Sequence, residues 1–86
     1  MNTDRLPKDV SRGAVIGLSE ADFAATGIGP QYFTRARKAM DRAAEKAGAP
    51  IAEQWAFTGF VRGMPVVGAG AVIAGEIHDW VEVVDG

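Results

Sequence analysis

Residues 30–50 read PQYFTRARKAMDRAAEKAGAP, and this stretch decides the fold because it holds both the clearest helix signal and the point where that helix ends. Pro30 suits the start of a helix, where its missing N–H costs no hydrogen bond, and Gly48 suits the C-terminal cap. The apolar residues between them recur every three or four positions and share one face: Tyr32, Phe33, Ala36, Met40, Ala43, Ala44 and Ala47. The spacing predicts a helix over residues 31–47, whose alanine-rich end another segment can approach closely.

The sequence after Gly48-Ala49-Pro50 is apolar and punctuated by glycine. Alternate residues over 55–61 are aromatic, glycine or β-branched, which favours a strand. A helix is the alternative there, because the apolar residues of 52–60 would also share a helical face. Residues 64–74 and 77–84 predict two further strands. We therefore expect an α+β fold in which two N-terminal helices pack on a small antiparallel sheet of about three strands.

Shorter elements precede the main helix. Residues 14–18 are an apolar run consistent with an edge strand, and Ser19 followed by Asp22 resembles a helix N-cap. Gly27 and Gly29 limit this first helix to about two turns. We expect the polar residues 1–12 to form a flexible N-terminal arm and residues 13–86 to form a single small domain.

Length and composition restrict the classes of function. A domain of 86 residues buries only about 60 to 65% of its unfolded surface, so association with another chain would supplement a small core. The absence of cysteine excludes disulfides, thiolate metal sites and a cysteine nucleophile. Residues 1–9 do not read as a secretory signal, and residues 63–75 are too short to span a bilayer. We expect a cytoplasmic protein without membrane contact.

Charge is unevenly distributed along the chain. Residues 35–46 hold five basic and two acidic side chains, whereas residues 53–86 hold five acidic side chains and one arginine. The net charge of -2 gives no general attraction to nucleic acid. The basic helix and the acidic C-terminal segment are therefore two separate candidate binding surfaces.

Residues 18–38 resemble a helix-turn-helix, with a capped short helix, a turn at Gly27 and a longer second helix. The resemblance implies a DNA-binding regulator in which helix 31–47 reads the major groove. The outward-facing residues of that helix would then contact DNA: Gln31, Thr34, Arg35, Lys38 and Arg42. The family places a small residue where Phe23 stands here, and adjacent Tyr32 and Phe33 favour packing. An ordinary helical hairpin with a basic solvated face is the alternative interpretation.

Three consecutive six-residue units, 61–66, 67–72 and 73–78, each begin with Val or Ile. They are similar to the hexapeptide repeats of left-handed parallel β-helix acyltransferases. Three units would form only one coil, and repeat stacks need neighbouring coils to bury a core. The alternative is a glycine-rich pair of strands in which another part of the chain comes close to the glycines.

His78 is the only histidine, and acidic residues surround it. In a strand, Glu76, His78 and Glu82 share a face that could hold a divalent ion or support proton transfer, but Trp80 interrupts that face. An acidic edge that discourages aggregation of sheets is the alternative. We expect no enzymatic activity, no metal and no cofactor, and keep a catalytic or metal site at His78 only as a third hypothesis.

These observations lead us to expect a small non-enzymatic protein that acts by protein–protein association, as an oligomeric subunit, an assembly factor or an inhibitor. Small chains of this kind are reminiscent of proteins encoded by phages or mobile elements. The aromatic and acidic residues after Pro50 are the expected contacts with a protein partner or a second copy: Trp55, Phe60, Trp80, Glu76, Asp79 and Glu82. DNA binding through helix 31–47 is the alternative function.

Overall fold

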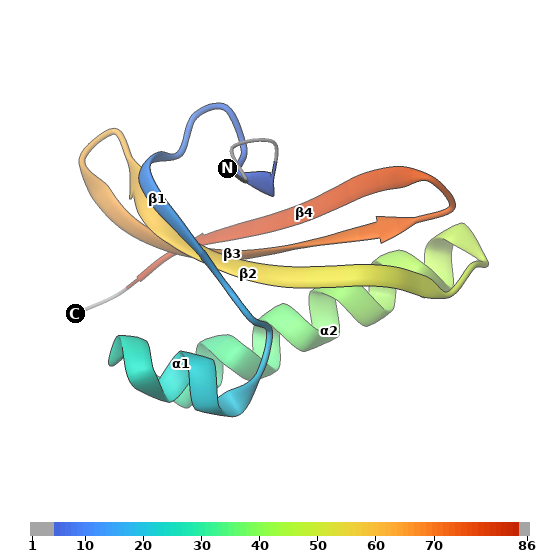
Figure 1. The fold of residues 1–86 in the computed structure, drawn as a ribbon, viewed down its shortest axis with the longest axis horizontal. Helices are drawn as coiled ribbons and strands as arrows, with labels where there is room; N and C mark the ends of the chain where they lie inside the picture. Colours follow the sequence, from blue (N-terminus) through green and yellow to red (C-terminus); the bar gives the residue numbers. More distant parts are fainter. Residues whose placement is uncertain (1–4, 85–86) are drawn as a thin grey trace.

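The structure, a computed structural model, describes residues 5–84. The elements follow in the order β1 (Ser11–Ile16), α1 (Glu20–Thr26), α2 (Pro30–Ala47), β2 (Ile51–Val61), β3 (Met64–Ile73) and β4 (Glu76–Val83). Within these residues the strands form one antiparallel sheet in the order β1-β2-β3-β4. Both helices lie on one face of the sheet, and the segment that leads into β1 lies on the other face (Figure 1).

The α+β class is confirmed, with two corrections to its details. Over residues 5–84 the sheet has four strands rather than about three, and a strand precedes the helices. The fourth strand is β1, which lies at one edge of the sheet, overlaps the apolar run of residues 14–18 that predicts an edge strand, and places Ile16 opposite Ala56 on β2. This pairing joins segments on either side of both helices, so the local pattern of residues 11–16 does not reveal it. Residues 51–61 form a strand, as the alternation favours, and not the alternative helix.

The N-terminal segment that we expected to be a flexible arm divides into three parts. Residues 1–4 lie outside the described residues. Leu6 and Val10 pack with Trp55, whose Nε1 donates a hydrogen bond to the carbonyl oxygen of Arg5 at 2.9 Å. Ser11 begins β1, so the expected boundary at residue 12 falls inside a strand.

The helix ends lie where the sequence predicts them. Ser19 caps α1 by accepting a hydrogen bond from the Asp22 N–H, and Gly27 ends that helix in the left-handed conformation. Pro30 begins α2, and Gly48 ends it with φ 66°. Phe23 packs edge-on against Phe33, with ring centroids 5.5 Å apart, and so joins α1 to α2. Phe23 is thus a packing residue of the helical hairpin.

The core between α2 and the sheet is built largely from small side chains. Ala36 and Met40 of α2 are buried against Ala56, Ala69 and Ala71 of β2 and β3. Methyl groups on both sides allow the helix to lie close to the sheet. The alanine-rich face of the helix packs on the segment beyond Gly48, as the sequence suggests.

The opposite face of the sheet is built around two glycines of β3. Trp55 lies opposite Gly70 across the β2–β3 ladder, and Phe57 lies opposite Gly68. A Cβ atom at residue 70 would come within 2.6 Å of the Trp55 ring, and one at residue 68 would collide with the Phe57 ring and the Trp80 carbonyl. The glycines therefore give the aromatic rings room to lie flat across β3.

The resemblance to hexapeptide repeats does not extend to the fold. Residues 64–73 and 76–83 form an antiparallel hairpin, whereas hexapeptide units form parallel coils. The turn at Ala74 and Gly75 has positive φ at both residues, which reverses the chain tightly. The alternative of a glycine-rich strand pair with close neighbours is confirmed.

Gly70→Ala should lower the free energy of unfolding by about 1–3 kcal/mol, because the added methyl group overlaps the Trp55 indole. Urea denaturation measures this cost. In a Trp55→Leu background the indole is absent, so the two substitutions should be non-additive by about 1 kcal/mol or more. Strict additivity would show that Trp55 does not set the space at residue 70.

Candidate protein-binding edge

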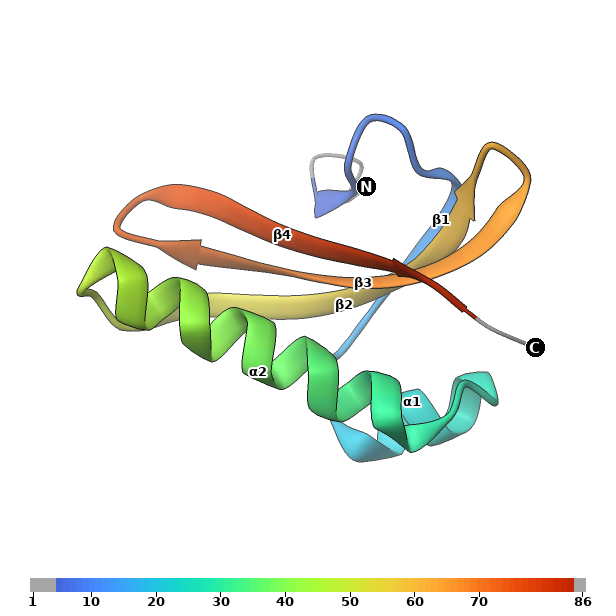
Figure 2. The ribbon, with the colours of Figure 1, turned by 180° about the vertical axis from the view of Figure 1, so that it is seen from behind.

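The sheet ends in two edge strands of different character. β1 is short, has an irregular register between Ser11 and Ala14, and contains Arg12 at φ 51°, all of which hinder pairing with a further strand. β4 pairs with β3 without a register shift over its whole length. Figure 2 shows β4 along the near side of the sheet with α2 beneath it. β4 is therefore the edge that is suited to accept another strand.

The hydrogen-bond pattern shows which backbone groups of β4 point away from the sheet. The Val84 N–H donates to the Pro65 carbonyl oxygen at 2.9 Å, which makes these two residues a hydrogen-bonded pair. Hydrogen-bonded and non-hydrogen-bonded pairs alternate along an antiparallel ladder. The odd-numbered residues of β4 therefore direct their N–H and C=O groups away from β3: Ile77, Asp79, Val81 and Val83. Among the described residues no strand lies on that side.

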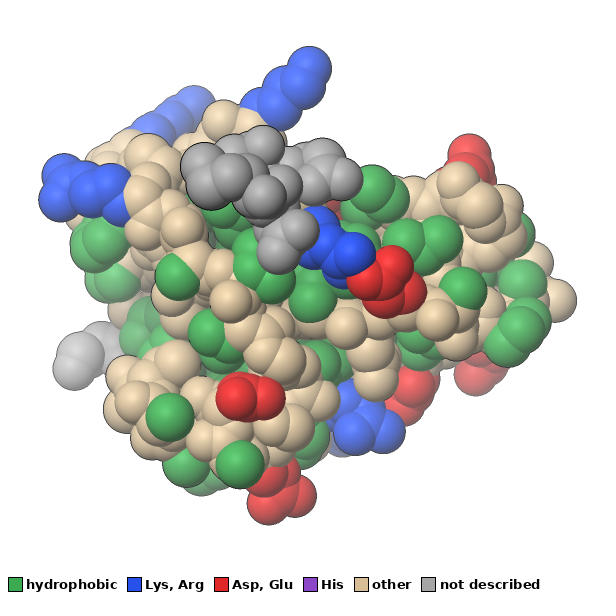
Figure 3. All heavy atoms as spheres, in the orientation of Figure 1, with side chains coloured by type: hydrophobic (Ala, Val, Ile, Leu, Met, Phe, Trp, Pro, Cys, Tyr) green, Lys and Arg blue, Asp and Glu red, His purple; other side chains and the backbone are tan. Residues whose placement is uncertain are grey.

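The side chains of these same residues form an exposed, mostly apolar row on the sheet face opposite the helices. Ile77 is 53% exposed, Val81 39% and Val83 41%, and Asp79 is the polar member of the row. Figure 3 shows hydrophobic side chains at the surface near the β3–β4 turn, at the right-hand end of the molecule. We call Ile77, Asp79, Val81 and Val83 the outer row.

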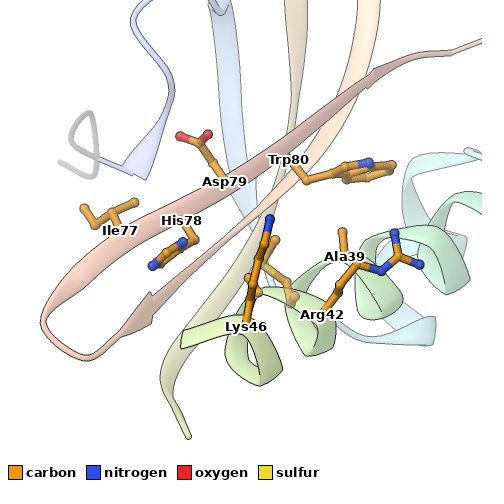
Figure 4. Close-up of a pocket in the computed structure, with 9 residues that line it drawn as sticks. Ala39, Arg42, Lys46, Ile77, His78, Asp79 and Trp80 are labelled. Atoms are coloured by element: carbon orange, nitrogen blue, oxygen red, sulfur yellow. The ribbon is translucent and has the colours of Figure 1, made fainter. Parts of the chain in front are cut away.

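The other face of β4 borders a groove beside α2. His78, Trp80 and Glu82 are partly buried on this side, and the groove has a volume of about 480 Å³. Arg42 and Lys46 line it from α2, and in Figure 4 both reach toward β4 while Asp79 points to the opposite face. The groove thus combines a basic wall with a floor of alanine, imidazole and indole groups.

The acidic residues of β4 do not cover the outer row. Glu82 lies on the helix side, where it forms an ion pair with Arg35, and Glu76 shares that side. Only Asp79 projects among the exposed apolar side chains. One carboxylate among three exposed aliphatic residues is weak protection for a strand of this length. This distribution argues against an acidic edge whose role is to prevent aggregation.

Four of the six expected partner-binding residues lie on β4, where Glu76, Trp80 and Glu82 share the helix side and Asp79 is on the other face. The other two expected residues lie on a different strand, β2. Trp55 is buried under the N-terminal segment, with the Arg5 guanidinium 4.5 Å from its ring centroid. Phe60 is partly buried, and the Arg12 guanidinium lies 5.3 Å from its ring.

The sequence pattern does not single out the three apolar residues of the outer row. Ile77, Val81 and Val83 read as one face of an ordinary half-buried strand. Their spacing of two and four residues is the signal that places them on one face. Their exposure follows only from the position of β4 at the edge of the sheet.

The residues expected to contact DNA all lie exposed on α2: Gln31, Thr34, Arg35, Lys38 and Arg42. The apolar face of α2 is occupied by the sheet, so this polar face is directed outward. Arg35 is engaged with Glu82. Tyr32 is buried and Phe33 is partly buried, in agreement with their expected packing role.

His78 shares the helix side of β4 with Glu76 and Glu82, as the strand spacing predicts. Within residues 5–84 no three His, Asp or Glu side chains converge in a way that could hold a metal ion. Trp80 lies between His78 and Glu82 along the strand, and Arg35 engages the Glu82 carboxylate. Within the described part of the chain, the geometry therefore gives no support to a metal site at His78.

Comparison of the chain with protein-family models, with curated proteins and with solved structures finds no match. Among the described residues, no helix combines the length and apolar character needed to cross a membrane. We therefore infer function from the surface of the chain itself, and β4 is the strongest candidate.

Val81→Ala should change the free energy of unfolding by about 0.5 kcal/mol or less, because the side chain is exposed. The same substitution at Val67, which is fully buried on β3, should cost roughly 1.5–3 kcal/mol. Chemical denaturation at sub-micromolar concentration compares the two variants without interference from association. Equal costs would mean that Val81 belongs to the core and not to a binding surface.

Proposed function

We propose that the protein acts by binding rather than by catalysis, and that a partner protein adds one extended strand to its sheet at β4. The observation that carries this proposal is the coincidence, on one strand, of outward-directed backbone groups and an exposed apolar row. A role as a subunit, an assembly factor or an inhibitor follows, since each of these acts by holding another chain.

The energetics of such an addition are favourable on both faces of β4. A partner strand would pair with the N–H and C=O groups of the outer row and cover Ile77, Val81 and Val83. Covering the remaining exposed area contributes roughly 0.5–1.5 kcal/mol for each of these side chains. On the other face, Arg42 and Lys46 favour a partner with acidic residues directed toward α2.

Selection of random short peptides on the immobilised protein tests this function. The wild type should enrich extended peptides that alternate apolar and acidic residues, and bound peptide should slow amide hydrogen exchange at Ile77, Asp79, Val81 and Val83. Asp79→Pro should abolish the enrichment, because proline removes an outward N–H while leaving the β3–β4 ladder intact.

Asp79→Ala is the matched control, since it removes the same carboxylate but keeps the backbone N–H. It should enrich the same peptides as the wild type. Equal enrichment by Asp79→Pro and Asp79→Ala would place the binding site elsewhere, and no enrichment by any of the three proteins would remove strand addition as the function.

A DNA-binding regulator is the second candidate function, and the outward-facing basic residues of α2 support it. Lys38 and Arg42 are exposed, and no ion pair among the described residues neutralises them. Such a row can contact backbone phosphates along a groove of DNA. In its disfavour, Arg35 is already paired with an acidic residue of the same chain.

If α2 binds DNA, the double variant Lys38→Glu/Arg42→Glu should reduce the magnitude of the slope of log affinity against log salt by about 2. This is one unit for each lost phosphate contact. Lys8→Glu/Arg62→Glu has the same change in net charge at exposed positions away from α2 and should leave the slope unchanged. DNA retention that is absent, or equal in both double variants, rules this candidate out.

A further inference from the structure

We infer that the strand added at β4 is β4 of a second copy, so that two chains form one continuous sheet about a two-fold axis beside Trp80. This inference rests on the proposed function and names its partner. The two strands run antiparallel, and residues whose numbers sum to 160 lie opposite each other. Three properties of β4 select this arrangement: its backbone polarity, its outer row and its charges.

Backbone polarity restricts the register. A two-fold axis perpendicular to the sheet keeps the odd-numbered side chains of both strands on the same face of the sheet. Because residues that lie opposite each other in a sheet share a face, odd residues pair with odd residues. The residues that can exchange hydrogen bonds are Ile77, Asp79, Val81 and Val83. With the axis at Trp80, Ile77 meets Val83 and Asp79 meets Val81, each pair occurring twice. All four residues of each chain are then paired, giving about eight hydrogen bonds.

The outer row becomes continuous across the axis. Ile77 of one chain lies opposite Val83 of the other, which buries β-branched side chains against each other. Asp79 lies opposite Val81, so no two carboxylates are directly opposed. The exposed apolar side chains of the two chains thus cover one another in a single stripe.

The helix side shows charge complementarity in the same register. His78 lies opposite Glu82 of the second copy, and this position borders Arg42 and Lys46. The incoming carboxylate, which also pairs with Arg35 of its own chain, therefore approaches an imidazole and the basic wall of the groove. Trp80 meets its own counterpart at the axis, where a pair is not hydrogen-bonded and the side chains come closest.

Neighbouring registers are less favourable. Moving the axis to Asp79 places that carboxylate opposite itself and brings Glu76 opposite Glu82, so that like charges face each other in three pairs. Moving the axis to Val81 leaves Ile77 without a partner inside β4. Only the axis at Trp80 pairs all four residues of the outer row within β4 and avoids a direct like-charge contact.

Sedimentation equilibrium of the purified chain measures the association. The wild type should form a dimer with a dissociation constant on the order of 10 μM, typical of a small interface. Asp79→Pro should weaken it at least tenfold relative to Asp79→Ala, since each dimer loses two hydrogen bonds.

A charge pair at residue 78 tests the contact with Glu82. His78→Lys should dimerise at least tenfold more tightly than His78→Glu, because one places opposite charges and the other like charges across the axis, twice per dimer. Within one chain the basic groove wall would favour the glutamate instead. A purely intramolecular role for residue 78 therefore predicts that His78→Lys dimerises no more tightly than His78→Glu.

Cysteine pairing measures the register directly, and the natural chain supplies no competing thiol. Asp79→Cys and Val81→Cys chains, mixed and oxidised, should form a mixed disulfide, because opposed Cα atoms lie about 5.5 Å apart in a hydrogen-bonded pair. Efficient self-crosslinking of either variant alone would place the axis at residue 79 or 81 and overturn this register.

The outcomes separate this inference from the proposed function. A chain that stays monomeric at high micromolar concentration, yet selects peptides through β4, overturns the self-pairing and leaves strand addition in place. A dimer that is unaffected by Asp79→Pro also overturns the self-pairing, whereas strand addition at β4 is overturned only if Asp79→Pro and Asp79→Ala select peptides equally well.

Discussion

The close approach of α2 to the sheet is the contact on which the rest of the structure depends. Ala36 on the helix and Ala56, Ala69 and Ala71 on the sheet are all buried, and larger side chains at these positions would push the two layers apart. Because the helix lies so close, its basic side reaches the edge of the sheet. The groove beside β4, with Arg42 and Lys46 as its wall, follows from this packing.

Small residues also allow close packing on the opposite face of the sheet, where they are glycines and not alanines. Gly68 and Gly70 allow the rings of Phe57 and Trp55 to lie across β3, and the N-terminal segment then covers the indole. Both faces of the central parts of β2 and β3 are buried in this way, whereas β4 has a layer on only one face. The contrast between covered and uncovered strands leaves β4 as the surface that another chain can complete.

The parts of this fold that the sequence predicts depend on neighbouring residues, and the parts it does not predict depend on distant ones. Ser19, Gly27 and Gly48 mark helix ends through local hydrogen bonds, so both helices could be placed from the sequence. Residues 55–57 are buried on both faces of β2, which removes the clean alternation that distinguishes a strand from a helix. The exposure of Val81 depends on strand order, which no local pattern encodes, and Trp55 is covered by a segment that reads as a polar arm.

The distance in sequence between β1 and its partner has a consequence for how the chain folds. β2, β3 and β4 form a meander closed by short turns, whereas β1 can reach β2 only after the intervening helices bring Ile16 beside Ala56. Closing that longer loop carries the larger entropic cost, so the meander is expected to form first. During that interval β2 is a second open edge, and its apolar residues are available to other chains. Refolding should therefore become less efficient as chain concentration rises, because encounters between chains compete with the arrival of β1.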